Sequence, residues 1–255
     1  MSTKAQENTA SIAAQALWDE HGDGGGVELK VHKGVPLQSG MGSSAASAVA
    51  AVVAANSLLE VPLQAEELLM YAIEGEKYAS GGLHADNVAP SLLGGLVLCP
   101  QILLPEVVRL PVPDGISAAL IHPDLQVNTA QARRGLAKSC STQQWVDQQG
   151  LLAGFVAACA ASDADLVGKT LRDVIIEPQR KAAVPCFDVV KAAAEKGGAL
   201  GCSLSGSGPS IFALCKTGNA QNIAMLMEQA CRTQGIGCES CVSPMTAPGA
   251  QIEND

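Results

Sequence analysis

The chain has 255 residues, which is enough for one large or two modest domains and for a substantial buried core. Apolar residues make up 47% of it and charged residues 16%, with a mean hydropathy of +0.20, so a disordered chain is excluded. The net charge of −9 excludes a sequence-wide attraction to nucleic acid or to an anionic membrane surface. An anionic ligand must therefore be bound by local geometry.

The nine cysteines are odd in number, and the N-terminal residues contain no apolar signal segment. We therefore expect free thiols in a soluble cytoplasmic protein. The one CxxC pair, Cys238 and Cys241, lacks a second such pair or a nearby histidine pair, so we interpret it as part of a strand rather than a zinc site. The most apolar run, from Ala45 to Leu59, is too short for a membrane span and is predicted as a buried helix. We expect neither nucleic acid nor a membrane as a partner.

The first part of the sequence predicts helices separated by glycine-rich turns. Short polar side chains at 8–11 predict the cap of a helix that ends near Glu20, before a run of glycines. Apolar and polar residues alternate strictly over 27–33, which predicts a half-buried strand. Further predicted elements are a loop at 37–42, an apolar helix from Ser43, a second helix at 63–78 that ends before Gly81 and Gly82, and short strands at 94–99 and 106–110.

We place the domain boundary near Pro113, because the element order changes there. Beyond it we predict strands at 116–122, 199–204, 210–216 and 237–242, several helices between about 129 and 196, and one helix at 219–233. This order of elements is typical of an α+β split sandwich. The predicted domains are 1–113 and 114–255.

Two loops rich in glycine and serine carry the strongest chemical signal. The first, Pro36 to Ser47, runs directly into a helix, where glycines let the backbone approach a ligand and free N–H groups carry a partial positive charge. The second, Gly201 to Pro209, holds more glycine and serine than a hairpin needs. Either loop alone is explained by a helix cap or a hairpin turn. Together they predict an anionic ligand such as a phosphate.

Two further motif matches are rejected. The segment from Gly40 to Ala45 fits GxGxxG/A, but no strand runs straight into Gly40, which disfavours a dinucleotide site. Gly168-Lys169-Thr170 resembles the end of a phosphate-binding P-loop, yet Asp163 stands where that motif has its first glycine. We interpret this second segment as a helix surface.

Ionisable side chains gather between 74 and 87, around a Gly-Gly break. A solvated helix end accounts for the glutamates, but the polar residues at 84–87 come just before an apolar segment, so they must pair or bind a ligand. A single histidine argues against zinc, whereas one carboxylate, one hydroxyl and substrate phosphates suit Mg²⁺. Three arginines are candidates for a carboxylate, a surface ion pair being the alternative for each: Arg133, Arg134 and Arg180.

These segments together resemble a known family. Pro36 to Ser47 and Ser205-Gly206-Ser207-Gly208-Pro209 resemble the GHMP small-molecule kinase superfamily. Glu74 to Asn87, and above all His84-Ala85-Asp86-Asn87-Val88-Ala89-Pro90, resembles the homoserine kinases within it. The resemblance runs from about Asn8 to the C-terminus. It implies the α+β GHMP kinase two-domain fold, with an N-terminal ribosomal S5 domain 2-like ATP-binding domain and a C-terminal ferredoxin-like sandwich.

One part of the family pattern has no counterpart in this sequence. The family begins with a strand and a Pro-x-x-x-x-Asn-x-Gly-x-Gly-Phe-Asp type of segment, and Pro185-Cys186-Phe187-Asp188 is no substitute for it. The resemblance therefore implies an N-terminal domain that lacks its beginning.

The resemblance implies ATP-dependent phosphorylation of the side-chain hydroxyl of L-homoserine, with Mg²⁺, in threonine biosynthesis. It implies that Asn87, Thr129 and Arg133 are catalytic and that Ser44 and Glu76 hold the metal. The implied homoserine pocket comprises His84, Asp86, Asn87, Arg133 and Arg180. The implied ATP-binding residues are Asn8, Pro36, Leu37, Gln38, Ser39, Gly40, Met41, Gly42, Ser43, Ser44, Ser47, Ser205, Gly206, Ser207 and Gly208.

Three functional hypotheses stay open at this point. The first is a homoserine kinase. The second is another GHMP kinase that acts on a different alcohol, against which the segment 84–90 argues. The third is a truncated, non-catalytic remnant that binds nucleotide or only forms a homodimer.

Overall fold

The computed structural model describes residues 4–127, 132 and 134–253, and the chain divides into two compact units. Unit 1 comprises Met1–Leu37, Gly42–Arg109 and Thr246–Asp255, and unit 2 comprises Gln38–Met41 and Leu110–Met245. The chain passes from unit 1 to unit 2 between Arg109 and Leu110, three residues before Pro113. The C-terminal residues 246–255 belong to unit 1, although the chain just before them belongs to unit 2. The four residues 38–41 belong to unit 2, although the chain on either side of them belongs to unit 1.

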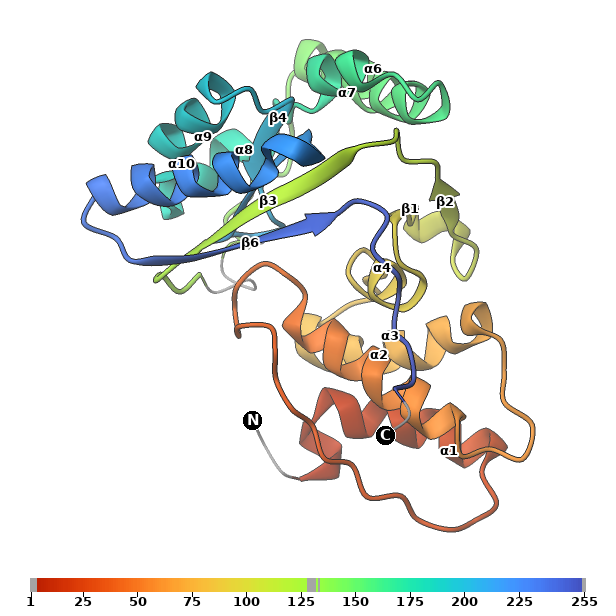
Figure 1. Ribbon diagram of the computed structural model, residues 1–255. Coiled ribbons are helices and arrows are strands. Elements are labelled where there is room, and N and C mark those ends of the chain that lie inside the picture. The colour runs from red at the N-terminus through yellow and green to blue at the C-terminus, as the bar shows by residue number, and fades with distance from the viewer. Residues whose placement is uncertain (1–3, 128–131, 133, 254–255) are drawn as a thin grey trace. The chain divides into compact units, whose positions relative to one another are not determined.

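Unit 1 is built mainly from helices (Figure 1). Asn8 caps the first of them, because its side chain accepts a hydrogen bond of 3.0 Å from the amide of Ala10. The helix from Ser43 and the helix that ends before Gly81 confirm the sequence prediction, although the latter is preceded by a 3-10 turn. The elements are η1 (Ala5–Glu7), α1 (Thr9–His21), α2 (Ser43–Asn56), η2 (Ala65–Leu68), α3 (Leu69–Ser80), α4 (Val88–Leu93), β1 (Leu96–Leu98), η3 (Gln101–Leu103) and, at the border of the unit, β2 (Val108–Leu110), which pairs with β1.

Small residues allow the helices of unit 1 to approach closely. A Cβ atom at Gly75 of α3 would overlap the carbonyl oxygen of Thr9 in α1, and would lie 2.8 Å from the Cβ of Ala13 and 3.1 Å from that of Ala48 in α2. The core between these helices is made of alanine with larger aliphatic side chains such as Leu17 and Ile73. This packing explains how a chain with 3% aromatic residues fills its interior.

The prediction of a strand at 27–33 is wrong. These residues form neither helix nor strand. Val27 and Leu29 are less exposed than Glu28 and Lys30, so the alternation of burial is present over the first half of the segment. A strand also needs a neighbouring strand to accept and donate its backbone hydrogen bonds. No described strand pairs with 27–33, and the segment therefore remains irregular.

Unit 2 contains a four-stranded sheet in the order β4-β5-β3-β6, in which each neighbouring pair is antiparallel. The connection β3, helices, β4, β5, helix, β6 with this spatial order is the ferredoxin-like sandwich that the sequence predicts. The strands are β3 (Ile116–Pro123), β4 (Gly201–Leu204), β5 (Ile211–Lys216) and β6 (Cys238–Pro244). The helices and 3-10 turns are α6 (Thr142–Ala160), α7 (Ala164–Thr170), α8 (Glu177–Arg180), η4 (Lys181–Ala183), α9 (Phe187–Lys196), η5 (Thr217–Asn219) and α10 (Ala220–Thr233).

Helices α9 and α10 lie next to each other against the sheet of unit 2 (Figure 1). Their buried residues, among them Phe187, Ile223 and Met227, form one core with Ile121 of β3 and Ile211 of β5. Two sequence interpretations are confirmed in this unit: the CxxC pair lies in β6, and the P-loop-like segment 168–170 lies in α7.

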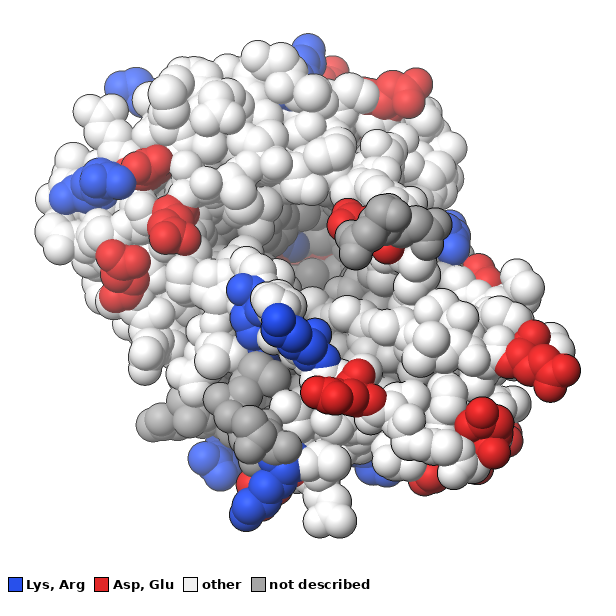
Figure 2. All heavy atoms as spheres, turned by 60° about the horizontal axis from the view of Figure 1, so that its bottom comes forward, with Lys and Arg blue, Asp and Glu red and all other residues white. Residues whose placement is uncertain are grey.

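Across the described ranges, no helix is long and apolar enough to cross a membrane. On the face drawn in Figure 2, basic and acidic side chains are interspersed among uncharged ones.

Candidate active site

In unit 1, the first glycine loop ends where helix α2 begins. Gly42 adopts the left-handed conformation, with φ of 72°, and the helix starts at the next residue. The hydroxyl of Ser43 donates to the carbonyl oxygen of Val35 at 2.8 Å, and the hydroxyl of Ser47 donates to that of Ser43 at 3.1 Å. Both serines are buried. These bonds hold the first turn of α2 against the chain that precedes the loop.

A lysine that the sequence analysis missed lies at this turn. The ammonium of Lys33 donates to the carbonyl oxygen of Ser43 at 2.6 Å, to its hydroxyl at 3.2 Å and to the hydroxyl of Ser47 at 2.5 Å. Burial lowers the pKa of Lys33, and the nearby carboxylate of Glu76 opposes this shift. The available signal was a lysine placed three residues before Pro36, at the entrance of the loop.

The predicted metal ligand Glu76 is close to the same turn. It lies on α3, is 8% exposed, and interacts electrostatically with Lys33. The close approach of α3 at Gly75 explains why an acidic side chain reaches the interior beside α2. Ser44, the other predicted ligand, is half-buried in the first turn of α2. One buried carboxylate and one hydroxyl suit Mg²⁺ when a substrate supplies the remaining oxygens, so these residues fit the metal.

The described residues contain no cluster of three His, Cys, Asp or Glu side chains that could hold a metal.

The polar segment 84–87 reaches the first loop through Asn87. A Cβ at Gly42 would lie 2.8 Å from both the Cβ and the Oδ1 of Asn87, so the amide packs against the bare backbone of that glycine. His84 and Asp86 line a cavity of about 100 Å³ together with Cys99, Gln101 and Leu104. The structure thus brings Asn87 to the start of α2, while Asn8 lies at the start of α1, where its side chain serves as the helix cap.

In unit 2, the two glycine loops are in direct contact. The hydroxyl of Ser205 donates to the carbonyl oxygen of Gly40 at 2.9 Å, and the amide of Ser210 donates to the carbonyl oxygen of Ser39 at 3.2 Å. A Cβ at Gly40 would overlap the carbonyl oxygen of Ser205 and lie 2.8 Å from that of Gly208. Positive φ angles occur at Gly40, Gly206 and Gly208, which are glycines for that reason.

The remaining predicted residues are distributed as follows. Arg180, at the end of α8, donates from Nη1 to the carbonyl oxygen of Gly206 at 2.6 Å, so it lies at the second loop. Ser39 and Ser207 are buried, Leu37 and Gln38 are exposed, and Pro36 and Met41 are half-buried. The predicted residues Thr129 and Arg133 lie outside the described residues.

The sequence that forms these loops and units matches two known protein-family models. The family model "GHMP kinases N terminal domain" matches residues 8–95, and the model "GHMP kinases C terminal" matches residues 155–230. The chain therefore belongs to the GHMP kinases.

Similar proteins assign it to a narrower group. The chain is 42% identical over 250 residues to homoserine kinase of Xylella fastidiosa, a match that covers 98% of this chain and 77% of that protein. It is 42% identical over 231 residues to homoserine kinase of Chlorobium phaeobacteroides, covering 89% and 72%. The crystal structure of homoserine kinase from Cytophaga hutchinsonii superimposes with a TM-score of 0.91 at 44% identity, covering 95% of this chain and 78% of that one. Within the GHMP kinases, the chain is a member of the homoserine kinase family.

More distant structures share the fold. The crystal structure of L. major mevalonate kinase in complex with R-mevalonate superimposes with a TM-score of 0.63 at 16% identity, covering 95% of this chain and 78% of that one. This likeness shows a common architecture and says nothing about a common substrate.

Proposed function

We propose that this chain transfers the γ-phosphoryl group of ATP to the side-chain hydroxyl of L-homoserine, giving O-phospho-L-homoserine and ADP, as a step of threonine biosynthesis. The observation that carries the proposal is the bond between Ser205 and Gly40, which joins the two loops that the sequence singled out for an anionic ligand. Phosphoryl transfer asks a protein mainly to position its substrates and to neutralise charge. The residues around these loops are suited to both tasks.

Residues of unit 1 would neutralise the charge of the phosphates. The backbone amides at the start of α2 provide donors and the positive end of the helix dipole. The ammonium of Lys33, held by Ser43 and Ser47 at this turn, adds a full positive charge. Because burial lowers the pKa of Lys33, an arriving phosphate would favour its charged form.

Glu76 and Ser44 would hold Mg²⁺. When bound, this ion would neutralise phosphate charge and align the transferred group. The protein's contribution is a carboxylate that is already desolvated, at 8% exposure, so it gains by pairing with a cation.

Homoserine would be held by polar side chains of the segment 84–87 and by Arg180. Asn87 would orient the reacting hydroxyl, His84 and Asp86 would contact the polar part of the amino acid, and Arg180 would bind its carboxylate. A guanidinium carries five N–H donors in a planar fork, so one arginine can hold a loop carbonyl and a carboxylate at once. Thr129 and Arg133 complete the proposed set.

We also place the reaction in the cytoplasm. The nine cysteines are free thiols, a state that a reducing compartment maintains, and this supports the location. The assembly that we propose for this chain is a homodimer.

The experiment that tests the function measures ADP release with homoserine, mevalonate and galactose in turn, beside ATP-binding calorimetry. Turnover with homoserine alone is the expected result. Turnover with another alcohol would identify a different GHMP kinase. ATP binding without turnover would identify a non-catalytic remnant, and a folded chain that shows neither would refute the phosphate-loop assignment.

A further inference from the structure

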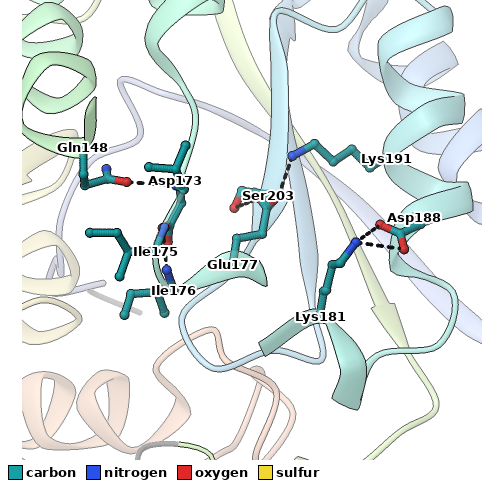
Figure 3. A network of polar contacts seen from close by, with 10 residues as sticks. Gln148, Asp173, Ile175, Ile176, Glu177, Lys181, Asp188, Lys191 and Ser203 are labelled. Atoms are coloured by element: carbon teal, nitrogen blue, oxygen red, sulfur yellow. Dashed lines mark hydrogen bonds and ion pairs between the residues drawn. The ribbon is translucent and has the colours of Figure 1, made fainter. Parts of the chain in front are cut away.

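A polar network in unit 2 lies outside the residues to which a function has been given. In Figure 3, the side chains of Lys191 from α9 and Ser203 from β4 converge on the carboxylate of Glu177, the first residue of α8. Lys191 Nζ lies 2.6 Å from Glu177 Oε1, and Ser203 Oγ donates to Glu177 Oε2 at 2.6 Å. Each carboxylate oxygen therefore has its own donor.

This network differs from the ion pairs on the surface. The side chains of Glu177 and Lys191 are only 11% and 23% exposed, whereas those of the nearby pair Lys181 and Asp188 are 42% and 71% exposed. Exposed pairs contribute little because water and salt screen them. A largely buried carboxylate with both oxygens bonded is held in one position, since moving it would leave charge desolvated without a partner.

The network anchors a helical segment, α8, that is too short to be stable by itself. Helix α8 has four residues, and a single turn is not stable in water without tertiary contacts. Asp173 Oδ1 accepts from the amides of Ile175 and Ile176 just before it, and the amide of Val174 donates to Gln148 of α6. Glu177 is thus the point at which α8 is attached to α9 and to the sheet.

The same turn carries Arg180, three residues after Glu177, and its Nη1 donates to Gly206 at 2.6 Å. In an α-helical turn, residues three apart lie on neighbouring positions of one face. A displacement of Glu177 would therefore move the guanidinium relative to the loop that it contacts.

We infer that Glu177, through Lys191 and Ser203, is a positioning residue that sets the guanidinium of Arg180 for the carboxylate of the amino-acid substrate. This rests on the proposed function, in which Arg180 contacts homoserine. Bidentate pairing requires the planar fork to be held in one orientation. The anchored turn supplies that orientation.

The test compares Glu177→Gln with the matched control Asp188→Asn, which removes one carboxylate charge from the exposed pair next to it. We expect Glu177→Gln to raise the KM for homoserine about tenfold or more, with kcat within about threefold and the KM for ATP within about twofold of the parent. Asp188→Asn should leave all three values unchanged. Circular dichroism and a thermal melt of each variant report whether it is folded.

A double-mutant cycle separates positioning from general structural damage. If Glu177 acts through Arg180, then Glu177→Gln added to Arg180→Ala should raise the KM for homoserine no further than Arg180→Ala does alone. Exchanging the charges, with Glu177→Lys and Lys191→Glu together, should recover part of the loss seen with either change. Full additivity in the cycle, or a parallel rise in the KM for ATP, would overturn the inference.

The outcomes also separate this inference from the function on which it rests. A folded parent chain that turns over no homoserine refutes the proposed function and this role with it. An active parent whose Arg180→Ala variant keeps its KM for homoserine refutes the role of Arg180. An active parent with a sensitive Arg180 and an unaffected Glu177→Gln variant refutes the positioning role alone.

Discussion

The hydroxyl of Ser205 donates a hydrogen bond of 2.9 Å to the carbonyl oxygen of Gly40, a residue 165 positions earlier in the chain. This bond lies within unit 2, because residues 38–41 cluster with it although the flanking chain belongs to unit 1. Residues 38–41 of the first glycine loop therefore belong to unit 2, and the rest of that loop belongs to unit 1. Its conformation depends on contacts that no local sequence pattern specifies.

Gly40→Ala should disturb this contact. In Gly40→Ala, the new methyl group would overlap the carbonyl oxygen of Ser205, at a residue whose φ of 78° disfavours any side chain. We expect the two loops to separate locally and the Kd for ATP to rise at least about tenfold, equivalent to about 1.4 kcal/mol. Calorimetry with ATP measures this. Gly34→Ala is the control, because nothing lies within 4 Å of a Cβ there, and equal effects of both changes would contradict the prediction.

Asn87→Ala should separate catalysis from nucleotide binding. The amide of Asn87 packs on Gly42 at the start of α2 and makes no capping hydrogen bond to α4, so its removal should not unfold that helix. We expect kcat with homoserine to fall about 100-fold, because the acceptor hydroxyl loses its orientation. ATP binding should persist in calorimetry. Equal loss of turnover and of ATP binding would point to misfolding.

Glu76→Gln should weaken the response to Mg²⁺. The amide keeps the size of the buried carboxylate but removes the charge, so we expect the Mg²⁺ concentration for half-maximal velocity to rise about tenfold or more. The loss of that charge should also lower the pKa of Lys33 further. Glu74→Gln is the control: it lies two residues earlier on α3, 44% exposed and paired with Lys77, and should leave the Mg²⁺ titration unchanged. An equal shift of the Mg²⁺ titration in both variants would mean that charge on α3 acts at long range.

Alkaline pH should destabilise the fold through its buried thiols. Burial raises the pKa of Cys202 and of Cys238 to about 12 and that of Cys231 to about 11, from an ordinary value of 9.0. Between pH 9 and about 11–12 the unfolded chain loses protons that the folded chain keeps. The stability that these thiols contribute is therefore complete below pH 9 and declines above it, by up to about 1.4 kcal/mol per thiol and pH unit.

Urea unfolding at pH 7, 9 and 10 measures this decline. The expected result is a midpoint that changes little between pH 7 and 9 and falls between pH 9 and 10. Cys202→Ala should reduce the fall, whereas Cys140→Ser, at an exposed position, should not. A parent midpoint that is constant up to pH 10 would show that the buried thiols are accessible to solvent in the folded chain.

Local patterns were sufficient to predict most elements of this chain. Neighbouring residues are enough to predict the polar cap at Asn8, the apolar helix from Ser43 and the strands around Ile121 and Ile211, because capping and periodicity act over one or two turns. The same reasoning failed at 27–33, where alternation was present but pairing depends on a distant strand. A pattern of burial does not by itself supply a hydrogen-bond partner.

The candidate site divides in the same way. The sequence alone singled out two glycine loops and the segment 84–87 as candidates for chemistry, because their composition exceeds what turns and caps require. Only the tertiary structure decided that Ser205 bonds to Gly40, that Lys33 lies on the first turn of α2, and that Glu177 holds the turn that carries Arg180. These contacts join residues on different elements, and their geometry follows from how the helices and the sheet pack rather than from any spacing along the chain.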